Sequence, residues 1–234
     1  MRAQPEVRLP SLEHPLRVGL LGGTFDPVHN GHVEMAETAL RWARLDAVYF
    51  VTSFDPPHKS GKGLANFLDR HAMVALALVN KPRLIPSSME YERRGKSYSV
   101  DTVRQLKNTL GTTSRIFFLI GIDAFLEIGS WKEHSSLPEL CRFIIFSRPG
   151  FRREDLASRL PEPYPENLLP VSKDGEFQDC DPNWLYLLED FSSSIASTDI
   201  RNQVRLGKSI SAFVPDGVAE YIEKTKLYLG EEGS

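Results

Sequence analysis

Short apolar runs alternate in the first part of the chain with segments whose apolar residues repeat at helical spacing. Residues 17–21 form a run that ends at two glycines, and residues 32–45 then place apolar side chains three and four positions apart. Residues 47–52 form a second run, and residues 67–79 return to the helical pattern. This order predicts a βαβα opening.

The middle of the chain continues the alternation. Residues 100–110 predict a helix with Ser99 as its N-cap residue. Residues 116–120 read IFFLI, and an entirely apolar run is typical of a strand covered on both faces in a parallel sheet. A further strand is predicted at residues 143–146, whereas residues 84–85 are too few to predict one. Strands that alternate with helices in this way favour a parallel sheet.

The last third of the chain is less regular. Prolines interrupt residues 151–190, and we interpret this segment as an irregular excursion with one short strand at residues 184–188. A helix capped by Ser197 and another that begins at Pro215 follow. The predicted fold is therefore α/β: a Rossmann-like open parallel sheet with helices on both faces, right-handed crossovers and a helical C-terminal part.

Composition and charge narrow the classes of protein. Lys and Arg total 28 and Asp and Glu total 31, a net charge of −3, whereas duplex DNA and anionic membranes select a basic surface. We therefore expect neither nucleic acid nor a membrane as a partner. The two cysteines form no CxxC pair, which disfavours a disulfide scaffold and a protein-held metal site.

The chain ends and its organisation give three further expectations. Residues 1–15 carry charges and prolines in place of an apolar signal segment, so we expect a mobile N-terminal extension and a cytoplasmic protein. No apolar stretch reaches the roughly 18–20 residues of a membrane span. No linker divides the remainder, so we expect one domain over residues 16–234, as a monomer or a small homo-oligomer.

The richest local pattern is GGTFDPVHNGH at residues 22–32. Ligands of open α/β sheets bind beyond the carboxyl ends of the strands, and two glycines at such an end let the backbone approach an oxyanion. The following helix directs N–H groups and the positive end of its dipole to the same place. His29 and His32, three residues apart, can both face the turn. A tight turn followed by two surface histidines would explain either feature alone, but not the whole segment.

This segment resembles the GGTFDPxHxGH signature of the nucleotidyltransferases, specifically of the bacterial nicotinate-nucleotide adenylyltransferase family. The resemblance covers nearly the whole chain. It includes PPHK at residues 56–59, SYSVDT at 97–102, IGID at 120–123 with Trp131 beyond it, RPG at 148–150, and IASTDIR at 195–201. The first and last of these motifs, residues 22–32 and 195–201, mark the superfamily. The SYxxDT, IGxD-to-Trp and RPG blocks narrow the resemblance to the nicotinate enzymes.

The resemblance implies one set of ATP-binding residues and one of catalytic residues. Asp123 would bind ribose hydroxyls, although a carboxylate there also suits a helix N-cap. The implied ATP site comprises Gly22, Gly23, Thr24, Phe25, Gly121, Asp123, Ile195, Ser197 and Thr198. The implied catalytic residues, all cationic or imidazole groups on the phosphates, are His29, His32, Arg201 and Lys59. A solvated lysine is the plain alternative for Lys59.

The second substrate implied is nicotinate mononucleotide. Trp131 would stack on its pyridine ring, with Tyr98 and Thr102 near the carboxylate and Arg148 near the phosphate. Read without the motifs, Trp131 is more often a core residue. Mg²⁺ is the implied cofactor, held mainly by the phosphates of ATP. One departure stands out: Ala196 replaces the usual serine, which removes a possible hydroxyl contact.

Three rival interpretations remain open at this stage. A phosphopantetheine adenylyltransferase shares the first motif but should be shorter and lack the SYxxDT and RPG blocks. A fragment of a class I aminoacyl-tRNA synthetase should carry a lysine-rich KMSKS loop in place of IASTDIR. A non-catalytic nucleotide sensor is disfavoured because both histidines and Arg201 are present.

Overall fold

The computed structural model describes residues 15–57, 63–111, 113–148, 160–162, 164, 168–177, 184–189, 191 and 195–229. Its strands form one seven-stranded sheet, of order β3-β2-β1-β4-β5-β7-β6, in which every pair is parallel. The strands are β1 (Arg17–Gly23), β2 (Ala47–Thr52), β3 (Leu84–Ser87), β4 (Arg115–Gly121), β5 (Arg142–Phe146), β6 (Leu168–Val171) and β7 (Leu185–Leu188). The predicted open parallel sheet is confirmed.

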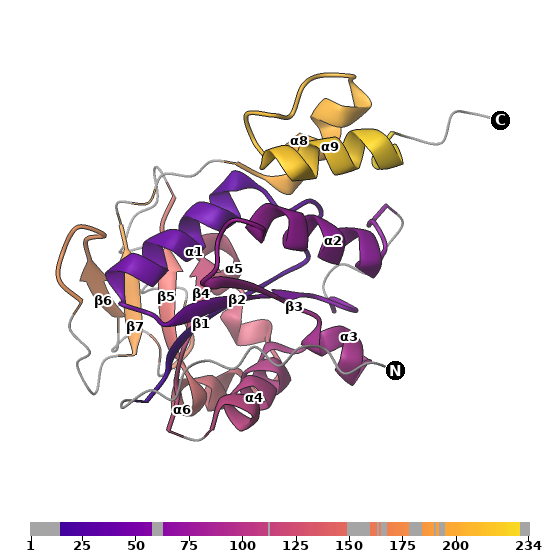
Figure 1. Ribbon diagram of the computed structural model, residues 1–234. Helices are drawn as coiled ribbons and strands as arrows, with labels where there is room; N and C mark the ends of the chain where they lie inside the picture. Colours follow the sequence, from indigo (N-terminus) through magenta and orange to yellow (C-terminus); the bar gives the residue numbers. More distant parts are fainter. Residues whose placement is uncertain are drawn as a thin grey trace.

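Helices cover both faces of the sheet (Figure 1). One face carries α1 (Asn30–Trp42) and α2 (Phe67–Leu78), and the other carries α4 (Ser99–Leu110) and α6 (Leu137–Leu140). The shorter elements are α3 (Met89–Arg93), α5 (Ile122–Phe125) and the 3-10 turns η1 (Ile128–Ser130) and η2 (His134–Ser136). The fold is therefore layered as the alternating pattern predicts.

Burial on both faces explains why residues 116–120 of the central strand β4 are all apolar. Phe117 and Leu119 face the core under α1 and α2, whereas Ile116, Phe118 and Ile120 face the core under α4. All five side chains are at most 5% exposed. Because successive side chains of a strand point to opposite faces, a strand buried on both sides has no position for a polar residue.

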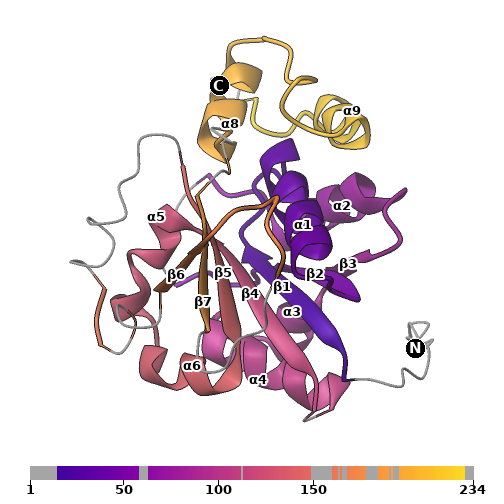
Figure 2. The same cartoon turned by 90° about the vertical axis from the view of Figure 1, so that its left-hand side faces the viewer.

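The C-terminal part, α8 (Ser197–Arg205) and α9 (Asp216–Thr225), packs on the same side as α1 and α2 (Figure 2). Ile200, Val218 and Ile222 join the core beneath it. The segment before α9 also reaches the start of α1, where the N–H of Asn30 donates to the carbonyl of Phe213 at 2.9 Å. This segment therefore closes over the end of the sheet where the glycine-rich turn lies.

Four details differ from what the sequence predicts: two additional edge strands and two helix N-cap residues. The excursion contains a second strand, β6, and residues 84–87 form β3; both lie at sheet edges and each contains a proline. The N-cap residue of α4 is Tyr98 and not Ser99, and that of α8 is Ala196 and not Ser197.

The expected extension, residues 1–15, falls outside the described residues except for Pro15. Among the described helices, none has the length and apolarity needed to cross a bilayer.

Candidate active site

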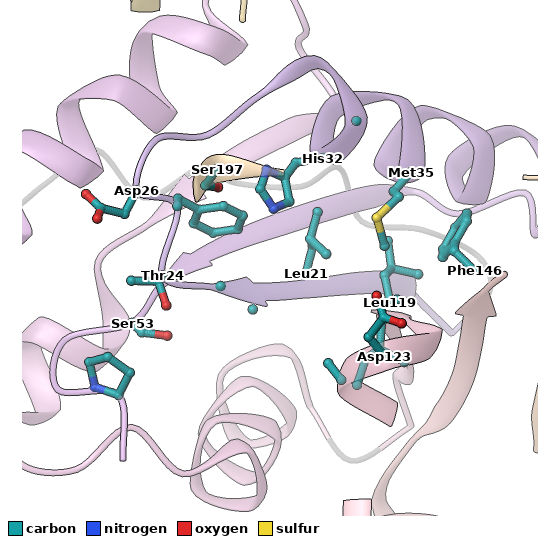
Figure 3. Close-up of a pocket in the computed structure, with 18 of the residues that line it drawn as sticks. Leu21, Thr24, Asp26, His32, Met35, Ser53, Leu119, Asp123, Phe146 and Ser197 are labelled. Atoms are coloured by element: carbon teal, nitrogen blue, oxygen red, sulfur yellow. The ribbon is translucent and has the colours of Figure 1, made fainter. Parts of the chain in front are cut away.

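A cavity of about 590 Å³ opens where β1 and β4 end side by side (Figure 3). The chain order of the strands reverses between these two strands, and such switch points are the usual ligand sites of open α/β sheets. Most of the predicted site residues line it: Gly22, Gly23, Thr24, Phe25, His29, His32, Thr102, Gly121, Asp123, Trp131, Arg148, Ile195, Ser197, Thr198 and Arg201. Tyr98 is not among the lining residues, and Lys59 lies outside the described residues.

The two glycines of the turn have different tasks. A Cβ at Gly23 would approach the ring of Phe25 to 2.8 Å, so that position requires glycine. Gly22 has only ordinary contacts around an added Cβ, the nearest at 3.8 Å, and it borders the cavity. Phe25 itself is 2% exposed and has φ +51°, an uncommon conformation for an aromatic residue. The buried ring of Phe25 therefore packs against the backbone of the turn at Gly23, and Phe25 also lines the cavity.

His29 and His32 meet at the start of α1. His29 is the N-cap residue, and the two rings stack with centroids 3.6 Å apart. The backbone N–H of His29 donates to Nδ1 of His32 at 3.3 Å. Since Nδ1 is the acceptor, a neutral His32 carries its proton on Nε2. The expectation of free N–H groups at this helix start is wrong for Asn30, whose N–H is bonded to Phe213.

Burial controls the charge of His29. Desolvation, assisted by the positive charge of Arg148, lowers its pKa from 6.5 to about 4. The folded protein therefore holds this imidazole neutral near pH 7, whereas the unfolded chain binds a proton below pH 6.5. A neutral imidazole has one ring nitrogen that donates a hydrogen bond and one that accepts.

This pKa predicts a pH-dependent stability. Between pH 6.5 and 4 the unfolded state binds more protons at His29, so the free energy of unfolding should fall as the pH falls. The loss from this group should reach about 3 kcal/mol near pH 4. Urea titrations of the wild type and of His29→Asn between pH 7 and 4 measure it, because the variant should lose less stability. Equal losses would contradict the lowered pKa.

The start of α8 lies beside the glycine-rich turn, and both line the cavity. The hydroxyl of Ser197 donates to the carbonyl of Pro27 at 3.0 Å, which ties α8 to that turn. Arg201 donates through Nη1 to the carbonyl of Asp26 at 2.7 Å and through Nη2 to Thr198 Oγ1 at 3.3 Å. Because Ala196 is the N-cap residue, no cap side chain covers the first N–H groups of α8. An anion is a suitable partner for such a helix start.

An ion pair crosses the far side of the cavity. Arg148 Nε lies 2.8 Å from Asp123 Oδ2, and both side chains are about half exposed. Figure 3 shows Asp123 beside Leu119 and Phe146, away from Asp26 and Thr24. An exposed ion pair of this kind is worth little, at most about 1 kcal/mol, so a ligand with an anionic and a hydroxyl group can replace it.

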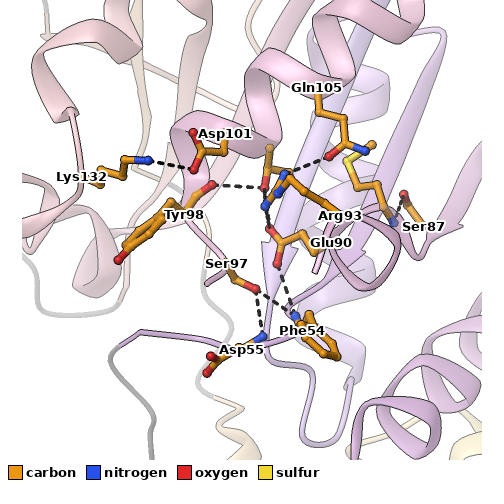
Figure 4. Close-up of polar contacts among 12 residues, drawn as sticks. Phe54, Asp55, Ser87, Glu90, Arg93, Ser97, Tyr98, Asp101, Gln105 and Lys132 are labelled. Atoms are coloured by element: carbon orange, nitrogen blue, oxygen red, sulfur yellow. Dashed lines mark hydrogen bonds and ion pairs between the residues drawn. The ribbon is translucent and has the colours of Figure 1, made fainter. Parts of the chain in front are cut away.

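Thr102 is buried and belongs to a polar network in which Figure 4 labels Glu90, Arg93 and Ser97. Its hydroxyl donates to Glu90 Oε1 at 2.5 Å and accepts from Arg93 Nη2 at 3.1 Å. Glu90 Oε2 accepts from the N–H of Phe54 at 3.4 Å, and Ser97 Oγ accepts from the same N–H at 2.9 Å. Thr102 therefore links α4, through Glu90 on α3, to the segment after β2.

Sequence reasoning missed several lining residues, above all Asp26, Glu90 and Ser97. Glu90 follows β3, which was not predicted, so nothing placed it at this edge of the sheet, whereas Ser97 begins the SYSVDT motif but was not singled out as a site residue. A prediction of β3 would have placed Glu90 there, since the carboxyl ends of parallel strands meet at one edge. Asp26 lies inside the glycine-rich motif, but its role depends on contacts far along the chain.

Comparison with known proteins gives the family. A model of cytidylyltransferase-like proteins matches residues 20–203. A protein of Citrifermentans bemidjiense named "Probable nicotinate-nucleotide adenylyltransferase" is 38% identical over 216 residues, which cover 92% of this chain and 99% of that protein. One of the same name from Desulfitobacterium hafniense is 39% identical over 214 residues, 92% of this chain and 96% of that protein. The chain belongs to the nicotinate-nucleotide adenylyltransferase family.

The fold of this family member also matches solved structures. The nicotinic acid mononucleotide adenylyltransferase of Plasmodium falciparum, solved in complex with NaAD, superposes with a TM-score of 0.69 at 21% identity. The match covers 91% of this chain and 97% of that one. A putative nicotinate-nucleotide adenylyltransferase of Vibrio parahaemolyticus gives a TM-score of 0.60 at 16% identity, over 92% and 96% of the chains. These likenesses establish the shared architecture.

Proposed function

We propose that this chain transfers the adenylyl group of ATP to nicotinate mononucleotide, with pyrophosphate as the second product. The observation that carries the proposal is the cavity at the switch point. The two histidines and Arg201 line one side of this cavity, and Trp131 and Arg148 line another. Cationic and hydrogen-bonding groups thus stand where a triphosphate would lie, and an aromatic ring where a pyridine would stack.

The reaction is an exchange of bonds at one phosphorus. An oxygen of the mononucleotide 5′-phosphate bonds to the α-phosphorus of ATP, and the bond from that phosphorus to the bridging oxygen of the β-phosphate breaks. The nucleophile is already ionised, so no general base is needed. The task of His32, His29 and Arg201 is to orient the phosphates and to stabilise the charge that moves to the leaving pyrophosphate.

Mg²⁺ enters this proposal as part of the ATP substrate complex. No cluster of three or more His, Cys, Asp or Glu side chains suited to a metal occurs among the described residues. The carboxylates that line the cavity have partners: Asp26 with Tyr228, Asp123 with Arg148 and Glu90 with Thr102. This donor set suits an ion that is held by phosphate oxygens and water rather than by the protein.

The ion pair of Arg148 with Asp123 bears on both substrates. In the proposed complex Asp123 turns to the ribose hydroxyls of ATP, and Arg148 turns to the phosphate of the mononucleotide. The two groups form an ion pair at 2.8 Å, so binding of either substrate in this way requires the pair to separate. Arg148 also lies near enough to His29 to lower its pKa, which places it beside the phosphate-binding wall.

A product assay tests the proposal. Pyrophosphate release is measured with ATP against nicotinate mononucleotide, nicotinamide mononucleotide and phosphopantetheine, and the products are identified by mass spectrometry. Dependence on a pyridine mononucleotide, with a dinucleotide product, is the expected result. Release with phosphopantetheine alone would identify the rival transferase. ATP binding without turnover on any of the three would favour the nucleotide sensor.

A further inference from the structure

The carboxylate of Asp26 is buried behind the glycine-rich turn and is only 2% exposed. Its Oδ1 accepts hydrogen bonds from the hydroxyl of Tyr228 at 2.8 Å and from the N–H of Ala65 at 3.2 Å. Its Oδ2 is buried with no hydrogen-bond partner within the described part of the chain, and it lies 3.6 Å from Arg201 Nη1. One oxygen is thus held by two donors, and the other is within ion-pair distance of a cation but makes no hydrogen bond to it.

Arg201 is placed by this same residue. Nη1 donates to the backbone carbonyl of Asp26 at 2.7 Å, and Nη2 donates to Thr198 Oγ1 at 3.3 Å. Its Nε is buried and makes no hydrogen bond to any residue that the structure describes. The guanidinium therefore stands beside a carboxylate at a distance just beyond a hydrogen bond, with donor capacity left for a ligand.

Tyr228 reaches Asp26 from the turn that follows α9, 202 positions along the chain. Its backbone has φ +66°, and that of Lys226 has φ +58°, in the left-handed region that aromatic and long side chains rarely adopt. Such a conformation persists only where contacts hold it. Burial and the negative charge of Asp26 raise the pKa of Tyr228, so the hydroxyl stays protonated and remains a donor.

We infer that Tyr228 is a positioning residue for Arg201 in the proposed adenylyl transfer, acting through Asp26. While the Tyr228 hydroxyl holds Oδ1, the carboxylate keeps its orientation and Oδ2 stays 3.6 Å from Nη1. Without that hydroxyl, Oδ1 keeps only the N–H of Ala65. The carboxylate then turns to the nearest strong donor, Arg201, and competes with the triphosphate for the guanidinium. This inference rests on the proposed function, which makes Arg201 a ligand of the ATP phosphates.

The chain contains a matched control for this hydroxyl. Tyr221, on α9, also donates to a carboxylate, Asp69 Oδ1, at 2.7 Å. Neither Tyr221 nor Asp69 lines the cavity. Tyr228→Phe and Tyr221→Phe therefore delete the same group, bonded to the same kind of acceptor, in the same part of the fold. Any effect of general loosening should appear in both variants.

The test measures ATP and AMP binding by titration calorimetry on the full chain, with thermal melts as a check of folding. Tyr228→Phe should weaken ATP by roughly tenfold and AMP by less than about threefold, as expected for one charge-assisted contact. Tyr221→Phe should leave both affinities unchanged. In an Arg201→Ala background, Tyr228→Phe should have no further effect on ATP. In turnover, Tyr228→Phe should raise KM for ATP and leave KM for the mononucleotide unchanged.

The outcomes separate this inference from the proposed function. Equal ATP affinities in the two tyrosine variants would overturn the inference, as would equal weakening of ATP and AMP or a full effect without Arg201. Each of these results requires that the wild type binds ATP, and so leaves the proposed function intact. A wild type that binds no ATP would overturn both. The positioning role would be established if Tyr228→Phe had the same Tm as Tyr221→Phe but bound ATP about tenfold more weakly than that control.

Discussion

Replacing His32 by alanine is expected to lower kcat by about 10²- to 10³-fold, the usual effect of removing a positioned donor from a site of charge development. The ring stands in the first turn of α1, against His29 and at the edge of Phe25. Its Nδ1 accepts the N–H of His29, so a neutral ring carries its proton on Nε2 and can act as a hydrogen-bond donor there. Steady-state kinetics with ATP and nicotinate mononucleotide give the value.

Two checks accompany this measurement. The variant also loses the acceptor for the N–H of His29, which should lower stability by only about 1 kcal/mol, so circular dichroism should show an intact fold. His71→Ala is the matched control, since His71 is half-buried against Phe67 and outside the cavity lining. It should retain turnover within about threefold. Similar turnover in a folded His32→Ala protein would show that the imidazole is not part of the machinery.

The strands that the sequence predicts best are those at the centre of the sheet. Residues 116–120 lie between two cores, so every side chain had to be apolar and the run could not be mistaken. The glycine-rich turn after β1 was placed correctly for a related reason: the parallel arrangement sends the end of β1 to the switch point. Topology thus placed the glycine-rich turn at the site, whereas the individual site residues were predicted from the resemblance to the family.

The edges of the sheet could not be predicted in the same way. β3 reads LIPS and β6 reads LLPV, four residues each, with a proline that lacks the N–H of a regular ladder. An edge strand tolerates proline because one side of it has no neighbour to receive a hydrogen bond. Local pattern alone therefore reads these segments as loops. Missing β3 also hid Glu90, which follows it and lines the cavity.

Contacts between residues far apart in the chain are a second feature that could not be predicted from the sequence. The hydroxyl of Tyr228 and the carboxylate of Asp26 meet only because the C-terminal part folds back over α2 and the glycine-rich turn. Nothing in the spacing of these residues reports the contact. The cap residues are a smaller example, because Tyr98 and Ala196 occupy positions where a hydroxyl side chain is the usual choice. Tertiary packing decided these helix starts.

The wild type is expected to prefer nicotinate over nicotinamide mononucleotide by about 10- to 100-fold in kcat/KM. Tyr98 O accepts from the N–H groups of Asp101 and Thr102, so the N–H groups of Ser99 and Val100 precede the first bonded turn of α4. Ser99 lines the cavity. A carboxylate offers acceptors to such donors with both oxygens, whereas an amide offers one and turns an NH₂ group toward them.

Glu90 makes this prediction a demanding one, because its buried carboxylate lines the same cavity. Its oxygens already accept from Thr102 and Phe54, and Arg93 Nη2 lies 3.8 Å away. The Glu90 carboxylate is thus neutralised and hydrogen-bonded within this network. We expect the N–H groups of Ser99 and Val100 at the start of α4 to bind the substrate carboxylate instead. If Glu90 instead accepted the amide NH₂, nicotinamide would be favoured and Glu90→Gln would reduce that preference.

The ratio of kcat/KM for the two mononucleotides, measured in two variants, distinguishes recognition by the α4 N–H groups from recognition by Glu90. kcat/KM is measured for both mononucleotides in the wild type, in Trp131→Ala and in Glu90→Gln. Trp131 lines the cavity and would stack on either ring, so its removal should weaken both substrates together and leave their ratio unchanged. Glu90→Gln removes a negative charge while it keeps an acceptor for Thr102, so the nicotinate preference should persist or grow. Equal values for the two mononucleotides in the wild type would mean that the α4 donors do not meet the substrate carboxylate, and the pyridine ring would then be held by stacking alone.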